Sequence, residues 1–207
     1  MKEEWIRNII DREWLMFSQV ENQGGKASCQ SRPRTFEIMR RSQFLSWTEE
    51  ILGSYLQDLK DAEKAGRNLC TEKYAYMMEK TDPAGYEKIR KRLPVISGEK
   101  ADRIEEIVNV NILWEEETDR KFPRIRANGR PLRSEQDSFA GVSVETYLRC
   151  ELKTYSEKTI RLLHEYTAEE NRRGHNLAEE ILDNTMKAYG YASAKQAEEA
   201  LENDRRS

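Results

Sequence analysis

The chain has 207 residues, of which 35% are charged and 37% hydrophobic, and its net charge at pH 7 is −3. With 4 Trp, 9 Tyr and 5 Phe it is too rich in aromatic residues for a disordered chain, and its charge gives no general attraction to nucleic acid or anionic membranes. No apolar run approaches the roughly 18 residues that a membrane-spanning helix needs.

Apolar residues recur at steps of three and four along most of the chain, which predicts amphipathic helices. In the N-terminal half we expect helices over about 2–21, 36–47, 48–66, 71–80 and 82–93. Thr48 is a suitable N-cap for the third of these helices. Asp82 followed by Pro83 is a favourable N-cap and first-turn pair for the fifth.

The C-terminal half continues this pattern around one irregular region. Ser97 is expected to begin a helix that includes Trp114. In residues 122–142, which follow, the apolar residues show no helical periodicity. Ser143 is expected to cap the longest helix, whose apolar stripe continues past residue 155 and which ends at Gly174. Two shorter helices are expected over 176–190 and 193–203, the first with Asn176 as its N-cap and the second with a capping-box pattern at Ser193.

These elements predict the fold class. No alternating segment indicates a strand, and the chain has no internal repeat and no low-complexity linker. We therefore expect a single all-α domain over 1–207, a bundle of about eight helices with two irregular basic loops. Its core is expected over about 2–190, with the short helix 193–203 at the C-terminal end.

Positive charge is concentrated in the two irregular segments. Segment 22–34 contains three cations and segment 120–133 contains six, and neither contains an acid. Together they carry +9, which leaves −12 for the rest of the chain. Loops carry function more often than scaffold helices do, so both segments are candidate binding surfaces.

The stretch NQGGKASCQ places glycine N–H groups before a helix, an arrangement that can hold an anion, and GRPLRS offers two arginines suited to phosphate or carboxylate. The candidate ligand-binding residues of the loops are Asn22, Lys26, Gln30, Arg130 and Arg133. The alternative is that these are ordinary surface charges which pair with acidic helices at little net energy.

Several polar residues lie on the apolar stripes of the expected helices. They are Glu13, Arg40, Gln43, Glu145 and Arg149. Because a charge that faces a core is costly unless it is paired, Glu13 is expected either to pair with Arg40 or Arg149 or to line a cleft beneath the basic loops. In the second case Arg40, Gln43 and Arg149 complete the candidate anion site.

The evidence for catalysis is thin, and the sequence leaves open whether this is an enzyme. Cys29 near a helix start is a candidate nucleophile and Glu13 a candidate general acid or base. His164 and His175 are too far apart along a helix to bind one metal ion together, so no metal site is expected. No Walker-type or Rossmann-type glycine pattern is present, and no cofactor is indicated.

The phrases NQGGKASCQ, TFEIMRRSQF, GRNLCTEKYAYMM, GRPLRS and SVETYLRCELKTYSEKT, taken together, resemble a bacterial family catalogued as domain of unknown function number 4125. The resemblance extends from about Glu13 to Gly190. It implies a single-domain cytoplasmic bacterial protein and no particular activity. It also suggests a nucleotidyltransferase-like protein as a partner.

Two functions follow as expectations. The first is an anionic small-molecule site formed by loops 22–34 and 120–133. The second is a non-catalytic protein-interaction module, with RNA binding ranked lower because few exposed aromatics accompany the cations. A cytoplasmic location is expected because three separated cysteines form no disulfide framework and the acidic N-terminus is unlike a signal peptide.

Overall fold

The computed structural model describes residues 1–21, 25, 28–127 and 129–204, without the side chains of Cys29 and Asp204. These residues form eleven α-helices and three short 3-10 helices, and within them no strand, only one isolated β-bridge. The elements are α1 (Lys2–Ser18), η1 (Ser28–Ser31), α2 (Pro33–Leu45), α3 (Glu49–Lys64), α4 (Leu69–Thr81), α5 (Pro83–Ile89), η2 (Arg90–Arg92), α6 (Gly98–Lys121), α7 (Pro123–Arg126), η3 (Ser134–Gln136), α8 (Val144–Lys153), α9 (Glu157–Arg172), α10 (Leu177–Ala188) and α11 (Ala194–Asp204).

The predicted all-α class is confirmed, and the predicted N-caps act as expected. Each accepts a hydrogen bond from a backbone N–H in the first turn of its helix, which satisfies a group that would otherwise lack a partner. These caps are Thr48, Asp82, Ser97, Ser143, Asn176 and Ser193. Local side-chain chemistry therefore sets where most of the helices begin.

The prediction of one long helix from Ser143 to Gly174 is wrong. The chain breaks between α8 and α9, at residues 154–156. Ser156 N donates to Asp58 Oδ2 of α3 at 2.9 Å, and Ser156 Oγ caps α9 by accepting from the backbone N–H of Thr159 at 3.2 Å. The apolar stripe continues across the break, so the periodicity of the sequence does not reveal it.

Lys100 of α6 stabilises the same break from the other side. Its ammonium donates to the backbone oxygens of Lys153 and Tyr155, at 2.9 and 2.5 Å. Burial lowers the pKa of Lys100, which is the cost of placing an ammonium there. The Lys100 ammonium thus satisfies backbone oxygens at the end of α8 that N–H groups of a further helical turn would otherwise satisfy.

Replacing Ser156 with alanine is expected to lower the free energy of unfolding by about 1 kcal/mol, because the first turn of α9 loses its cap. Chemical denaturation of the two proteins measures this difference. Ser156→Asn retains a capping oxygen and is the control. A loss of equal size in the asparagine variant would show that the cap is not the cause.

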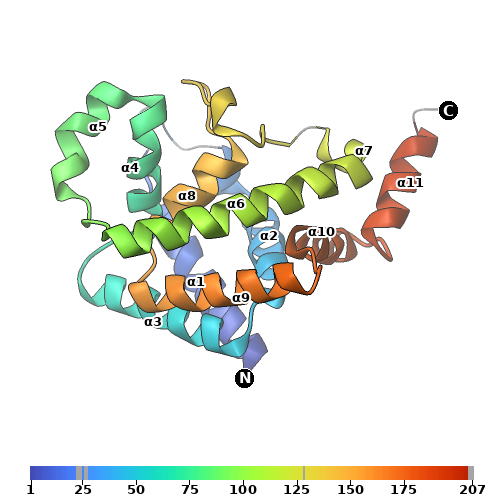
Figure 1. The fold of residues 1–207 in the computed structure, drawn as a ribbon, viewed down its shortest axis with the longest axis horizontal. Helices are drawn as coiled ribbons and strands as arrows, with labels where there is room; N and C mark the ends of the chain where they lie inside the picture. Colours follow the sequence, from blue (N-terminus) through green and yellow to red (C-terminus); the bar gives the residue numbers. More distant parts are fainter. Residues whose placement is uncertain (22–24, 26–27, 128, 205–207) are drawn as a thin grey trace.

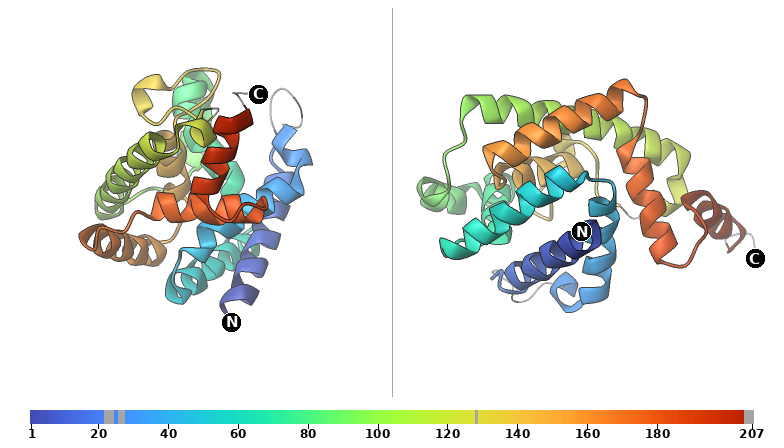
Figure 2. Two further views of the ribbon diagram at one scale, coloured as in Figure 1. Left: turned by 90° about the vertical axis from the view of Figure 1, so that its right-hand side faces the viewer. Right: turned by 90° about the horizontal axis from the view of Figure 1, so that it is seen from below.

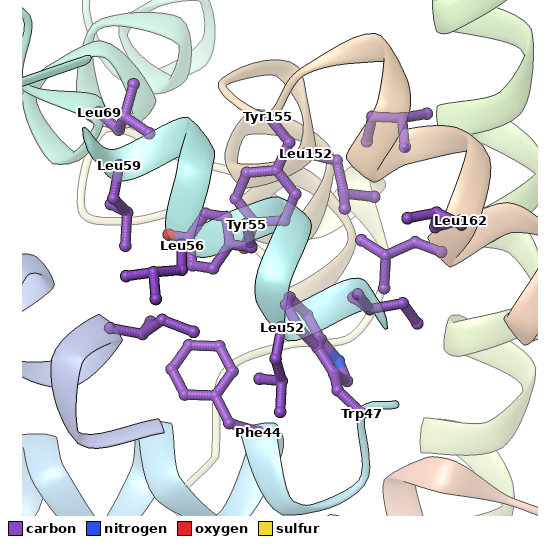
Figure 3. Packing of buried hydrophobic residues seen from close by; sticks show 14 of the residues in the cluster. Phe44, Trp47, Leu52, Tyr55, Leu56, Leu59, Leu69, Leu152, Tyr155 and Leu162 are labelled. Carbon is purple, nitrogen blue, oxygen red and sulfur yellow. The ribbon is translucent and has the colours of Figure 1, made fainter. Parts of the chain in front are cut away.

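The main core gathers apolar side chains from α1, α2, α3, α6, α8 and α9. At its centre Tyr55 and Tyr155 lie side by side, with ring centroids 4.4 Å apart, and Trp47 packs edge-on to both (Figure 3). Such ring pairs contribute beyond the area that they bury. The two tyrosines also bring hydroxyl groups into the core, next to the polar cluster described below.

Helix α6 crosses the molecule and packs along α9 and α8 (Figure 1). Helix α5 lies at one end of the long axis and α11 at the other, and the view from below shows the same separation (Figures 1 and 2). None of the described helices is both long enough and apolar enough to span a lipid bilayer.

Candidate functional site

A buried ion pair joins the first two α-helices. Arg40 of α2 donates two parallel hydrogen bonds to Glu13 of α1, from Nε to Oε2 at 2.7 Å and from Nη2 to Oε1 at 2.6 Å. The side chains are only 14% and 5% exposed, respectively. Both residues lie on apolar helix stripes, so burial of the stripes carries the charges inside, where each needs the other.

Helices α4 and α8 extend this pair into a network. The remaining nitrogen of Arg40, Nη1, donates to Gln43 Oε1 at 2.7 Å and to Glu151 Oε1 at 3.0 Å. Lys73 Nζ donates to the other oxygen of Glu151 at 3.1 Å. The two acids and two cations come from four different helices, and their formal charges cancel.

The two core tyrosines complete the coordination of the acids. Tyr55 donates its hydroxyl to Glu13 Oε1 at 2.6 Å, and Tyr155 donates to Glu151 Oε1 at 2.8 Å. Burial, followed by the nearby carboxylates, raises the pKa of both tyrosines well above the usual value. They therefore stay neutral donors at physiological pH.

The electrostatic balance of the network keeps its four charges in place. Burial alone would raise the pKa of Glu151, but Arg40, Lys73 and the hydrogen bond from Tyr155 outweigh it and hold that pKa well below its usual value. Burial opposes the charge of Lys73 as well, and Glu151 nonetheless raises the Lys73 pKa. Glu151 and Lys73 are therefore both ionised at neutral pH, as a buried ion pair requires.

At its outer end the network meets the loop of residues 129–142. Lys73 Nζ donates to the hydroxyl of Tyr147 at 2.8 Å and lies 4.5 Å from the centroid of that ring. The guanidinium carbon of Arg130 lies 5.1 Å from the same centroid. Arg130 Nη1 donates to the backbone oxygen of Val142 at 3.0 Å, which fixes the guanidinium over Tyr147.

The 129–142 loop is seated on the N-terminus of α8. Asp137 accepts from the backbone N–H of Ser143 and from the hydroxyl of Thr146, both at 2.6 Å. The backbone N–H of Val144 donates to the Pro131 oxygen at 2.8 Å. The loop thus satisfies N–H groups that a helix start leaves without partners, and this holds Arg130 in position.

Most cations of segment 120–133 are paired with acids of neighbouring helices. Arg126 contacts Glu115 and Asp119, and Arg133 contacts Glu116. Arg124 contacts Glu198 and Glu202, and Lys121 contacts Glu179. Within the described part of this segment, Arg120 and Arg130 are the two cations that have no carboxylate within salt-bridge distance, and of the two only Arg130 lies over an aromatic ring.

Two other candidate residues take part in structural contacts. Gln30 Nε2 donates to the backbone oxygens of Phe17 and Val20, both at 2.9 Å, and so caps the end of α1. Arg149 lies on a different face of α8 from Glu151 and pairs with Glu105 of α6 and with Glu145. The structure therefore selects Arg40 rather than Arg149 as the partner of Glu13.

The remaining candidates add no catalytic group. Asn22, Lys26 and the side chain of Cys29 lie outside the described residues. Burial raises the pKa of Cys70 to about 12 and that of Cys150 to about 11, so both remain protonated thiols and poor nucleophiles at neutral pH. In the described part of the chain no group of three or more His, Cys, Asp or Glu could hold a metal ion.

Sequence reasoning missed five residues of the network: Tyr55, Lys73, Tyr147, Glu151 and Tyr155. Tyr147 and Glu151 are four residues apart and so share a face of α8. This face lies beside the apolar stripe from which the helix was predicted. Lys73 precedes the apolar run YAYMM on α4. A search for opposite charges at the borders of apolar stripes would have flagged Lys73 and Glu151, although it could not have paired them.

A family model described as "Protein of unknown function (DUF4125)" matches residues 3–199. The chain belongs to this family. The match covers the whole buried network and the 129–142 loop, so the DUF4125 model spans both parts of the candidate site. No curated protein and no solved structure shows a significant match. Any function for this DUF4125 protein therefore has to be inferred from its own geometry.

Proposed function

We propose that this DUF4125 protein binds a small anionic molecule with a phosphate or carboxylate group at the outer end of the buried network. The observation that carries the proposal is Arg130, which is held over Tyr147, next to Lys73, without a carboxylate partner. The site combines one exposed guanidinium with a tyrosine hydroxyl and a largely buried ammonium. The contribution of segment 22–34 remains a prediction, because Asn22 and Lys26 lie outside the described residues.

The unused hydrogen-bond donors of these groups support the binding of an anion. The Tyr147 oxygen accepts from Lys73, and none of the described residues accepts its hydroxyl hydrogen. Arg130 uses Nη1 for Val142, and its other nitrogens contact no acceptor among the described residues. Guanidinium groups bind phosphate and carboxylate through paired N–H donors, which this arrangement offers.

Local charge supports the same conclusion. The formal charges of Glu13, Arg40, Glu151 and Lys73 cancel, and Arg130 places a further positive charge over Tyr147. Both oxygens of each buried carboxylate already accept hydrogen bonds. We therefore propose binding at this site, without a reaction carried out by Glu13.

Titration of the wild type with inorganic phosphate, AMP, glucose 6-phosphate and citrate tests the proposal by thermal shift and calorimetry. A ligand at about 100 times its Kd should stabilise the folded protein by about 2.7 kcal/mol. Arg130→Gln is expected to weaken binding at least about tenfold, which corresponds to about 1.4 kcal/mol.

Arg120→Gln is the matched control, because it removes the same charge from an exposed position in the same basic segment. Equal weakening in both variants would show only a general attraction of anions. Absence of binding by every anion in the series would contradict the proposal.

Protein binding is the second candidate. Phe139 is 83% exposed at the tip of a turn that is closed by two backbone hydrogen bonds between Ser138 and Gly141. Aromatic residues, Phe among them, are enriched at protein interfaces. Phe122 is only 4% exposed and cannot stack on bases, which favours a protein, such as a nucleotidyltransferase-like one, over RNA.

We further propose a reducing, cytoplasmic setting for either function. Cys70 and Cys150 are both free thiols. Disulfides are common in oxidising compartments and rare in the cytosol, so free thiols support this location.

A further inference from the structure

A small hollow of about 50 Å³ lies where α2, α6, α8, α9 and α10 meet. Most of its wall is apolar and belongs to the main core, which includes Trp47, Leu152 and Tyr155 (Figure 3). None of the described residues that line it is charged, although 35% of the chain is. A charged ligand would find no opposite charge there, so the hollow suits an uncharged one.

Two almost fully buried residues of this lining carry polar atoms without a partner. Trp47 is 6% exposed and Thr167 is 4% exposed. Neither the indole N–H of Trp47 nor the hydroxyl of Thr167 has a hydrogen-bond partner among the described residues. The one unpartnered polar side-chain atom there that is sealed from solvent is Arg12 Nε, so these two atoms remain within reach of water. Both residues line the hollow, which is where a partner can reach them.

Two amide side chains add further hydrogen-bonding capacity to the hollow. A guanidinium only donates, so the contact from Arg40 fixes the Gln43 oxygen toward Arg40 and leaves the Gln43 NH2 group without an acceptor in the described part of the chain. Asn111 Nδ2 donates to the Ile107 oxygen at 2.8 Å, which leaves Asn111 Oδ1 as an unused acceptor. The lining therefore offers both donors and acceptors, from α2, α6 and α9.

We propose that this hollow is a binding site for a small cluster of ordered water molecules. Water is uncharged, and it both donates and accepts hydrogen bonds, as the lining requires. A bound water needs about 15 Å³ of such volume and makes about three hydrogen bonds, so a hollow of about 50 Å³ accommodates about three of them. Bound waters remove the cost of burying the polar atoms of Trp47 and Thr167 without partners.

The water cluster extends the buried ion network to helices that contribute no charge to it. Gln43 holds Arg40 on one side and water on the other. The waters in turn bridge to Asn111 of α6 and Thr167 of α9. The charged members of the network come from α1, α2, α4 and α8, so the waters connect it to the rest of the helix bundle.

The stability of Thr167→Val tests the proposal, because valine keeps the shape of threonine and removes only its hydroxyl. Thr118→Val is the matched control: Thr118 is 1% exposed, and its hydroxyl donates to the Trp114 oxygen of its own helix at 2.8 Å. Both variants are expected to unfold at a lower urea concentration than the wild type, since each loses a hydrogen bond. A higher midpoint for Thr167→Val would show that its hydroxyl has no partner, and would overturn the proposal.

Oxygen-17 magnetic relaxation dispersion of the full chain counts long-lived water molecules in solution. The double variant Asn111→Leu, Thr167→Val makes the hollow more apolar, and apolar cavities stay dry. It is expected to lose the signal of about three waters relative to the wild type. Thr118→Val should retain the wild-type signal, because Thr118 does not line the hollow. Equal signals from the wild type and the double variant would contradict the proposal.

A high-resolution crystal structure of the wild type needs no variant and is the decisive measurement. Electron density for water is expected within about 3.2 Å of Gln43 Nε2 and Asn111 Oδ1, the range of a hydrogen bond. A hollow without such density would overturn the proposal, even if the double variant failed to fold. None of these substitutions touches Arg130 or Lys73, so the outcome is independent of anion binding.

Discussion

Arg40→Met is expected to lower the free energy of unfolding by about 3–5 kcal/mol, the usual result of breaking a buried ion pair. The substitution keeps most of the side-chain volume, and Arg40 already packs with its guanidinium 4.6 Å from the centroid of the Phe44 ring. It leaves Glu13 buried without its cation and removes the link to Glu151. Equilibrium unfolding in urea measures the loss.

Arg149→Met provides the matched control. Arg149 also contacts two carboxylates, of Glu105 and Glu145, but this pairing lies nearer the surface. Its loss is expected to cost less than about 1 kcal/mol, because water solvates the acids that remain. If both substitutions cost the same, the buried network would have no special part in stability.

Acid is expected to destabilise this protein through Glu151. Arg40, Lys73 and Tyr155 overcome the effect of burial and hold the Glu151 pKa well below its usual value. A carboxylate with a lowered pKa in the folded state stabilises the protein above its unfolded pKa, and this contribution is lost as the pH falls. Below about pH 4 the free energy of unfolding should fall by up to about 1.4 kcal/mol per pH unit for this one group.

Denaturation of the wild type and of Glu151→Gln across this acidic range separates Glu151 from the other carboxylates. The glutamine variant should be less stable at neutral pH, because Arg40 and Lys73 lose a shared anion. Its stability should also depend less on pH, since it lacks the proton that Glu151 takes up. An unchanged pH dependence in the variant would assign the acid sensitivity to other groups.

The all-α class, most helix starts and the presence of polar residues on apolar stripes were predictable from the sequence. Apolar spacing and N-caps depend on residues within one or two turns of each other, so a linear pattern contains them. The same spacing placed Glu13 and Arg40 on stripes that face the core. It predicted that each would need a partner there, and the structure confirms the pairing of these two.

The choice among partners was decided by the tertiary structure. Segment 120–133 appeared to be an uncompensated basic loop, yet acids from α6, α10 and α11 pair with four of its six cations. Asp58 and Lys100 likewise stabilise the break after α8, although the helical stripe continues across it. These contacts join residues far apart in the chain, so periodicity and capping carry no information about them. The sequence alone determined which groups needed partners, and only the packing of the helices against one another determined which partners they received.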